Sequence, residues 1–154
     1  KTAYEIMPSL VGSEMCIRDS ESTKAIETLI ETKGIQGVTI LRGISHVVLL
    51  SIYKHFDFFI SASNYEGFPL VLSEAVSNGL VPILSPLPVY QHILKKLGCG
   101  LIVDFNKDAE MAANSIHNFC RRVNKEKDSR KLIKKAKILF DWDKIAQQYL
   151  ALKP

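Results

Sequence analysis

The chain has no long hydrophobic run, few cysteines, and no repeat or low-complexity stretch. A membrane-spanning helix needs about 20 consecutive apolar residues, and no run of that length occurs in the 154 residues. The three cysteines form no Cys-x-x-Cys pair, which excludes a disulfide framework and a zinc knuckle. The start lacks the basic residues and apolar centre of a secretory signal. We therefore expect a reducing, cytoplasmic location.

Several catalytic signatures are also missing. The four histidines show no metal-ligand spacing with acids or cysteines, so we expect each to be a surface or core side chain rather than a metal ligand or a base. Outside the first 20 residues there is no serine nucleophile elbow. Cys99 lies between two glycines but has no neighbouring base to activate its thiol. Metal-assisted, serine and cysteine catalysis are therefore not expected.

The composition is that of one globular domain, with 47% hydrophobic and 23% charged residues and a net charge of +4. Nine basic and two acidic residues lie between Arg121 and Lys137. No aromatic side chains are interleaved there for base stacking, so the segment does not indicate nucleic-acid binding. It favours a solvated helix face, and the alternative is peripheral association with an anionic membrane surface.

The first 20 residues are set apart from the fold. Residues 8–20 resemble a peptide that arises when sequencing-linker DNA is translated. We therefore expect residues 1–20 to be a non-native leader, with a short irregular strand and loop as the alternative. The remaining residues, 21–154, are expected to form one domain that is incomplete at its start.

From residue 21 onward, helical and strand-like patterns alternate. Apolar spacing, glycines and prolines predict helices over 21–33, 47–55, 69–78 and 89–97. Short β-branched or aromatic runs predict strands over 38–41, 56–60, 80–84 and 101–105. Only helices follow, the last of them capped by Asp141. This alternation predicts an α/β fold, a Rossmann-like doubly wound parallel sheet that ends in several α-helices.

The segment from Ser61 to Gly79 contains the most informative pattern. It runs from the end of a predicted strand through a glycine loop into a helix, and this junction borders the ligand crevice in open α/β sheets. Gly67 allows close backbone approach, and Pro69 suits the first helical position. Free amides at the helix start attract an anion.

Two acids, Glu66 and Glu74, flank that helix start. They would repel a phosphate, but they suit the hydroxyl donors of sugars. A diphosphate between two polyols is a nucleotide sugar, which is the ligand that this combination indicates. The residues alone leave alternatives open: Glu66 could be an exposed acid favoured by the helix dipole, and Glu74 could lie on a solvated helix face.

The segment from Glu66 to Ile83 resembles the E-x7-E signature of the retaining, family-4-type (group 1) glycosyltransferases, which have the two-domain GT-B fold. The similarity extends over residues 21–152. It implies that Glu66 is the catalytic residue beside the donor sugar and that Glu74 contacts the ribose. It also implies that a run of backbone groups lies near the sugar and phosphates, those of Gly67, Phe68, Pro69, Leu70 and Val71.

The resemblance implies transfer of a sugar, with retention and without a metal, from a nucleotide-diphosphate sugar to a saccharide, lipid or small-molecule acceptor. The acceptor domain and the basic residues that grip the diphosphate lie upstream in this family, so we expect the isolated chain to be inactive. Two alternatives stay open: a noncatalytic Rossmann-like module that binds a nucleotide or a partner, and a GT-B nucleotide-sugar epimerase.

Overall fold

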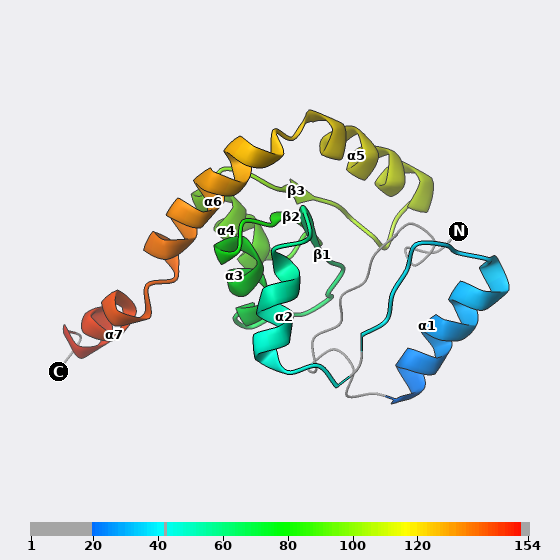
Figure 1. The fold of residues 1–154 in the computed structure, drawn as a ribbon. Coiled ribbons are helices and arrows are strands. Elements are labelled where there is room, and N and C mark those ends of the chain that lie inside the picture. Colours follow the sequence, from blue (N-terminus) through cyan, green and yellow to red (C-terminus); the bar gives the residue numbers. More distant parts are fainter. Residues whose placement is uncertain (1–19, 42, 152–154) are drawn as a thin grey trace.

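The computed structural model describes residues 20–41 and 43–151 (Figure 1). The leader expected over residues 1–20 lies almost entirely outside these residues. Ten elements follow in chain order: α1 (Ser20–Lys33), α2 (His46–Tyr53), β1 (Phe58–Ser61), α3 (Leu70–Ser77), β2 (Val81–Leu84), α4 (Pro88–Leu97), β3 (Leu101–Ile102), α5 (Ala109–Arg122), α6 (Lys125–Leu139) and α7 (Trp142–Ala151).

The three described strands form one parallel sheet in the order β1-β2-β3. Each passes to the next through a helix, α3 or α4, as a parallel connection requires. All four residues of β2 are buried, which is typical of a parallel strand covered on both faces. The carboxyl ends of the strands therefore lie at one edge of the sheet, which we call the carboxyl edge.

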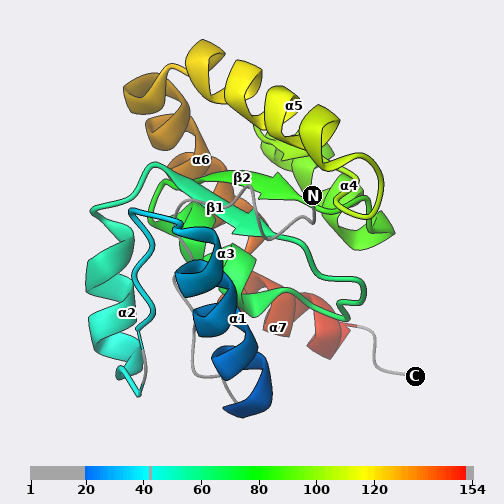
Figure 2. The same cartoon turned by 90° about the vertical axis from the view of Figure 1, so that its right-hand side faces the viewer.

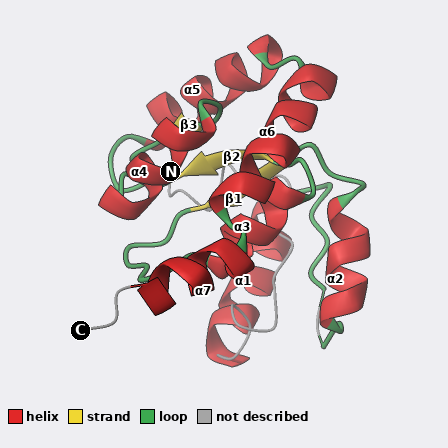
Figure 3. Cartoon of the chain, turned by 90° about the vertical axis from the view of Figure 1, so that its left-hand side faces the viewer, coloured by secondary structure: helices red, strands yellow, loops and turns green. Residues whose placement is uncertain are grey.

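Helices cover both faces of the sheet. Ile83 and Leu84 are neighbours in β2, so their side chains point to opposite faces. Ile83 packs in a cluster with Ala112 of α5, whereas Leu84 packs with side chains of α3, α4 and α6 that include Leu72 and Leu132. Figures 2 and 3 show β1 and β2 between α5 on one side and α3 on the other. The predicted α/β class with flanking helices is confirmed.

Polar side chains fix several helix starts. Ser45 accepts a hydrogen bond from the Val48 amide at the start of α2, and Asn124 accepts one from Lys127 at the start of α6. Asp141 accepts from the Lys144 amide at 3.2 Å, which confirms the cap predicted for the last helix. None of the described helices has the length and apolar character that crossing a membrane requires.

Two strand predictions are wrong. Residues 38–41 form no strand in the described part of the chain: no described strand pairs with them, and they lie between two glycines with positive φ, Gly37 (75°) and Gly43 (58°). The strand predicted over 101–105 ends at Ile102. Val103 still donates its amide to the Leu84 carbonyl at 2.8 Å, but the next amide of the parallel ladder would be that of Pro86, which has no hydrogen to donate.

Candidate functional site

Loops that follow the three strands meet at the carboxyl edge. The hydroxyl group of Ser85, after β2, donates to the carbonyl oxygen of Ser63, after β1. The side-chain amide of Asn106, after β3, donates to Asn64 Oδ1 at 3.2 Å. Helices that return antiparallel to such strands begin at this same edge, so α2, α3 and α4 also start here. The carboxyl edge is where open α/β sheets bind ligands.

Glu66 lies in the loop between β1 and α3 and is half-buried. The Ser63 hydroxyl group donates to Glu66 Oε1 at 3.1 Å. Glu66 is therefore not the fully exposed acid of the alternative interpretation, since one of its oxygens is held in place. The interaction leaves Oε2 with both of its lone pairs for other donors.

Behind Glu66 lies a buried tyrosine that the sequence did not reveal. Tyr90 of α4 is 1% exposed, and its hydroxyl group lies 2.9 Å from Ser61 Oγ, which in turn lies 3.1 Å from Ser63 Oγ. Burial raises the pKa of Tyr90, and the hydrogen bonds to Ser61 and Ser63 partly oppose that shift. The negative charge of Glu66 and a side-chain hydrogen bond to it add to the shift. In the sequence, Tyr90 fits the apolar stripe of an amphipathic helix, so its part in this cluster could not be predicted. The only sign of the cluster in the sequence is the pair of serines at alternate positions, Ser61 and Ser63.

Helix α3 begins without a side-chain cap. Its N-cap residue is Pro69, and the helix starts at Leu70, one residue later than predicted. Pro69 makes no side-chain cap hydrogen bond, and the first turn contains no acidic residue. The Leu70 amide bonds to the carbonyl oxygen of Phe68 at 3.0 Å. The next amides, those of Val71 and Leu72, thus belong to a first turn with no side-chain acceptor, which is the arrangement that suits an anion.

Gly67 lies at the centre of this loop, and its role differs from that of the other glycines. A Cβ atom added at Gly67 would meet nothing within 4 Å, and its φ lies outside the left-handed region. Neither packing nor backbone conformation within the described residues therefore requires glycine here. The position faces open space in front of the loop.

Glu74 lies in the second turn of α3, with 29% of its side chain exposed. His46, the first residue of α2, places its Nε2 atom 2.9 Å from Glu74 Oε1. Glu74 is therefore partly buried and paired, rather than part of a freely solvated face. His46 could not be predicted as the partner of Glu74 from the sequence, because the two residues are 28 positions apart.

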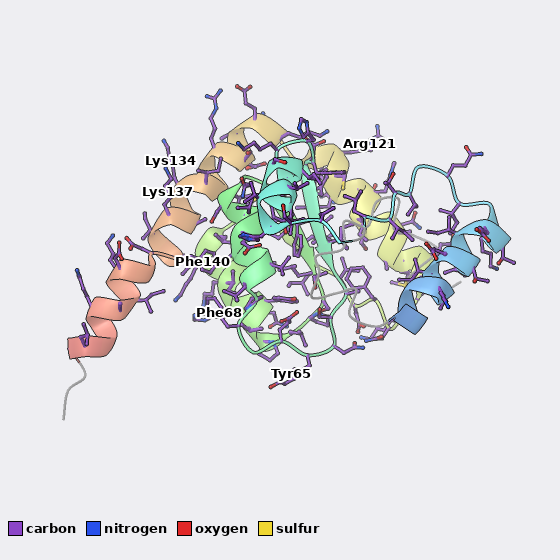
Figure 4. All side chains as sticks on the ribbon, turned by 60° about the horizontal axis from the view of Figure 1, so that its bottom comes forward. Tyr65, Phe68, Arg121, Lys134, Lys137 and Phe140 are labelled. Carbon is purple, nitrogen blue, oxygen red and sulfur yellow. The ribbon has the colours of Figure 1, made fainter. Side chains whose placement is uncertain are left out.

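The loop itself contains two aromatic residues, Tyr65 and Phe68. Phe68 packs edge-to-face on Phe140, with ring centroids 6.3 Å apart, so the loop contacts the junction between α6 and α7. Tyr65 is 86% exposed and points away from the body of the molecule (Figure 4). Of the predicted site residues, the structure thus brings Glu66, Gly67 and Phe68 together in one loop at the start of α3.

The described residues form no metal centre beside these groups. Within residues 20–41 and 43–151, no cluster of three His, Cys, Asp or Glu side chains could hold an ion. The burial of Cys99 and of Cys120 raises the pKa of each thiol, which makes both poor nucleophiles at neutral pH.

The basic segment identified in the sequence forms the end of α5 and most of α6. Two of its lysines anchor α6 to the end of α4: Lys131 Nζ donates to the Gly98 carbonyl and Lys135 Nζ to the Lys96 carbonyl, both at 3.1 Å. Lys134 and Lys137 point outward from α6 (Figure 4). The segment therefore has a structural side and an outward-facing side.

Solved glycosyltransferases share this fold. The structure of sucrose-phosphate synthase from Thermosynechococcus elongatus superposes with a TM-score of 0.75 at 28% identity, over 94% of this chain and 37% of the synthase. WaaG, a glycosyltransferase involved in lipopolysaccharide biosynthesis, superposes with a TM-score of 0.61 at 16% identity, over 83% of this chain and 33% of WaaG. The fold is thus the GT-B type of these enzymes.

Curated relatives agree with this result. The GDP-mannose:cellobiosyl-diphosphopolyprenol alpha-mannosyltransferases of Xanthomonas oryzae pv. oryzae and Xanthomonas campestris are each 29% identical over 92% of this chain. The chain spans 36% of the length of each of these two enzymes. The enzyme with that name from Komagataeibacter xylinus is 28% identical over 73% of this chain and 29% of its own.

A family model described as Glycosyl transferases group 1 matches residues 3–139. The matched range includes all of residues 8–20, for which the leader remains a prediction. It also covers the whole loop and helix that contain Glu66 and Glu74. The chain therefore belongs to the group 1 glycosyltransferases.

Proposed function

We propose that this chain is the donor-binding part of a glycosyltransferase that uses a nucleotide-diphosphate sugar. The observation that carries the proposal is the arrangement at α3: an uncapped helix start at the carboxyl edge, with the half-buried acids Glu66 before it and Glu74 within it. The amides suit a diphosphate, and the two carboxylates suit hydroxyl groups on either side of it. Membership in the group 1 family supports the same ligand.

The residues of the loop take separate roles in this proposal. Glu66 is the catalytic residue and meets the donor sugar with its free oxygen, while Glu74 meets the ribose diol. The backbone from Gly67 to Val71 lies along the sugar and phosphates, with room at Gly67 because no Cβ projects there. Helix amides stabilise the departing diphosphate, so no metal or cofactor is required. We propose retention of anomeric configuration, as in the family-4-type enzymes that the E-x7-E pattern resembles.

The relatives indicate a donor and an acceptor class. Because the two Xanthomonas enzymes are named for GDP-mannose and a diphosphopolyprenol-linked saccharide, we propose GDP-mannose as the donor and a lipid-linked saccharide as the acceptor, in polysaccharide biosynthesis. The chain spans about a third of those enzymes, so the acceptor would be bound by a preceding domain outside this chain. The chain alone is then expected to bind donor without turnover.

A lipid-linked acceptor places the enzyme at the cytoplasmic face of a membrane. The outward-facing cations of α6, including Lys134 and Lys137, would contact anionic lipid headgroups there. The enzyme would then associate with the membrane peripherally, through charge attraction at this helix.

Calorimetric titration of the chain with GDP, UDP and GDP-mannose tests the donor site. We expect GDP to bind in preference to UDP. Glu74→Ala should weaken GDP binding about 10- to 150-fold, the range for loss of a hydrogen bond to a charged group. The matched control is Glu110→Ala, which removes an exposed acid from α5. No nucleotide binding, or equal binding by the Glu74 variant, would refute the donor site.

A further inference from the structure

A row of hydrogen-bonded side chains, which we call the hydroxyl row, runs from the core to Glu66. It consists of Tyr90, Ser61, Ser63 and Glu66. Successive oxygens are 2.9 Å apart from Tyr90 to Ser61, 3.1 Å from Ser61 to Ser63, and 3.1 Å from Ser63 to Glu66. Its inner end is buried, because Tyr90 is 1% exposed, and its outer end is the Glu66 carboxylate in the loop between β1 and α3.

The carboxylate determines the direction of every proton in the row. An ionised carboxylate can only accept, so the single hydroxyl proton of Ser63 goes to Glu66 Oε1. Ser63 must then accept from Ser61, and Ser61 must accept from Tyr90. The phenol is thus the donor that starts the row. Its pKa is raised, chiefly by burial, so Tyr90 keeps this proton at neutral pH.

The row is fixed to the rigid part of the fold, whereas Glu66 lies in a loop. Ser85, directly after β2, donates its amide to the Ser61 carbonyl at 2.9 Å and its hydroxyl group to the Ser63 carbonyl. Tyr90 itself packs in the core cluster with Leu84 and Ile93. A loop carboxylate holds a productive geometry only if a supporting shell fixes it, and these contacts supply that shell.

We propose that Tyr90 is a positioning residue that orients the Glu66 carboxylate toward the donor sugar through Ser61 and Ser63. The inference rests on the proposed function, in which Glu66 contacts the sugar and α3 contacts the nucleotide diphosphate. Loss of the Tyr90 hydroxyl group should therefore weaken the binding of a nucleotide sugar and leave the binding of the nucleoside diphosphate unchanged.

Calorimetric titration with GDP and with GDP-mannose separates these effects. Tyr90→Phe keeps the ring in the core and removes only the first donor of the row. We expect the affinity for GDP-mannose to fall about 2- to 12-fold, the range for one net hydrogen bond, while the affinity for GDP is unchanged. Ser61→Ala should have the same effect, because it interrupts the row at its second member. The control is Tyr53→Phe, which alters another buried tyrosine, on α2.

The outcomes distinguish the inference from the function on which it rests. GDP binding with equal GDP-mannose affinity in the wild type and Tyr90→Phe would overturn the positioning role alone. An equal loss for both ligands would show a general structural effect and would also overturn it. No GDP binding at all would refute the donor site, and the positioning role with it.

A second measurement needs no ligand. Glu66→Gln removes the negative charge that contributes to the raised pKa of Tyr90, so the pKa of Tyr90 should fall in that variant. Absorbance titration of tyrosinate, with Tyr90→Phe subtracted, measures it. Glu74→Gln removes the other carboxylate of the site and should leave the Tyr90 pKa in place. An unchanged pKa in Glu66→Gln would show that the two ends of the row are not coupled.

Discussion

Among single residues, Gly67 and Gly100 differ in what they are needed for: we expect the first to serve ligand binding and the second to serve folding. Gly67 has open space around its missing Cβ, whereas a Cβ at Gly100 would lie 2.9 Å from the Pro82 carbonyl oxygen, at a φ of 132°. We expect Gly67→Ala to change the free energy of unfolding by less than about 0.5 kcal/mol yet to weaken GDP-mannose binding. Gly100→Ala should lower stability by about 1–3 kcal/mol. Urea unfolding and calorimetry of both variants measure this difference, and a strongly destabilised Gly67→Ala would contradict it.

The buried phenol predicts a loss of stability at alkaline pH. The folded chain holds the Tyr90 proton more tightly than the unfolded chain, because burial raises its pKa. Such a group contributes fully below its unfolded pKa, and its contribution is lost as the pH rises through the folded pKa. Cys99 and Cys120 shift in the same direction. Urea unfolding between about pH 8 and 11 should show falling stability, with a shallower fall in Tyr90→Phe. Equal slopes in the two proteins would rule out this role of Tyr90.

Residue by residue, the sequence predicted the acids but not the groups that hold them. Glu66 and Glu74 lie in one continuous segment, so their spacing around a helix start was visible in the chain itself. His46 and Tyr90 come from α2 and α4, and they reach those acids only because the parallel sheet places three helix starts at one edge. Such contacts depend on tertiary packing, which no local pattern contains.

At the scale of elements, the helix start of α5 tests how local signals stabilise the fold. Asp108 accepts from the Glu110 amide at 2.8 Å and from the Met111 amide at 3.0 Å. We expect Asp108→Ala to lower the free energy of unfolding by about 1 kcal/mol. Glu110→Ala, which removes a first-turn charge without removing a cap, should cost less than that. Chemical unfolding compares the two variants, and equal losses would mean that charge, not capping, stabilises this end.

The elements also show why strands were harder to predict than helices. The helices α1 to α4 appear within a few residues of their predicted limits, because caps and apolar periodicity are local. A strand exists only beside a partner. The apolar run at 38–41 has no described partner and stays irregular, and β3 ends where β2 ends, although Val103 and Phe105 are still buried beyond it. Burial and pairing are separate conditions, and only burial leaves a mark in the sequence.

At the scale of the whole molecule, charge predicts where the protein would associate. Nine basic residues lie between Arg121 and Lys137. Lys131 and Lys135 bond to the end of α4, whereas Lys134 and Lys137 point outward (Figure 4). Three of the exposed basic residues lie on α6: Lys127, Lys134 and Lys137. Each lysine near an anionic surface contributes about 1 kcal/mol of attraction, so the three together would dominate binding to anionic lipid.

Co-sedimentation with vesicles tests this association. We expect binding to vesicles with about a third anionic lipid, none to neutral vesicles, and loss of binding as salt shortens the screening length. Replacing Lys127, Lys134 and Lys137 together by glutamate should reduce binding at least about 100-fold, because each replacement turns an attraction of about 1 kcal/mol into a repulsion. The control replaces three exposed lysines outside α6, Lys54, Lys107 and Lys144, and so changes the net charge equally. If the control loses as much binding as the α6 variant, net charge rather than this helix face governs association; if neither loses any, or salt has no effect, the membrane proposal is wrong.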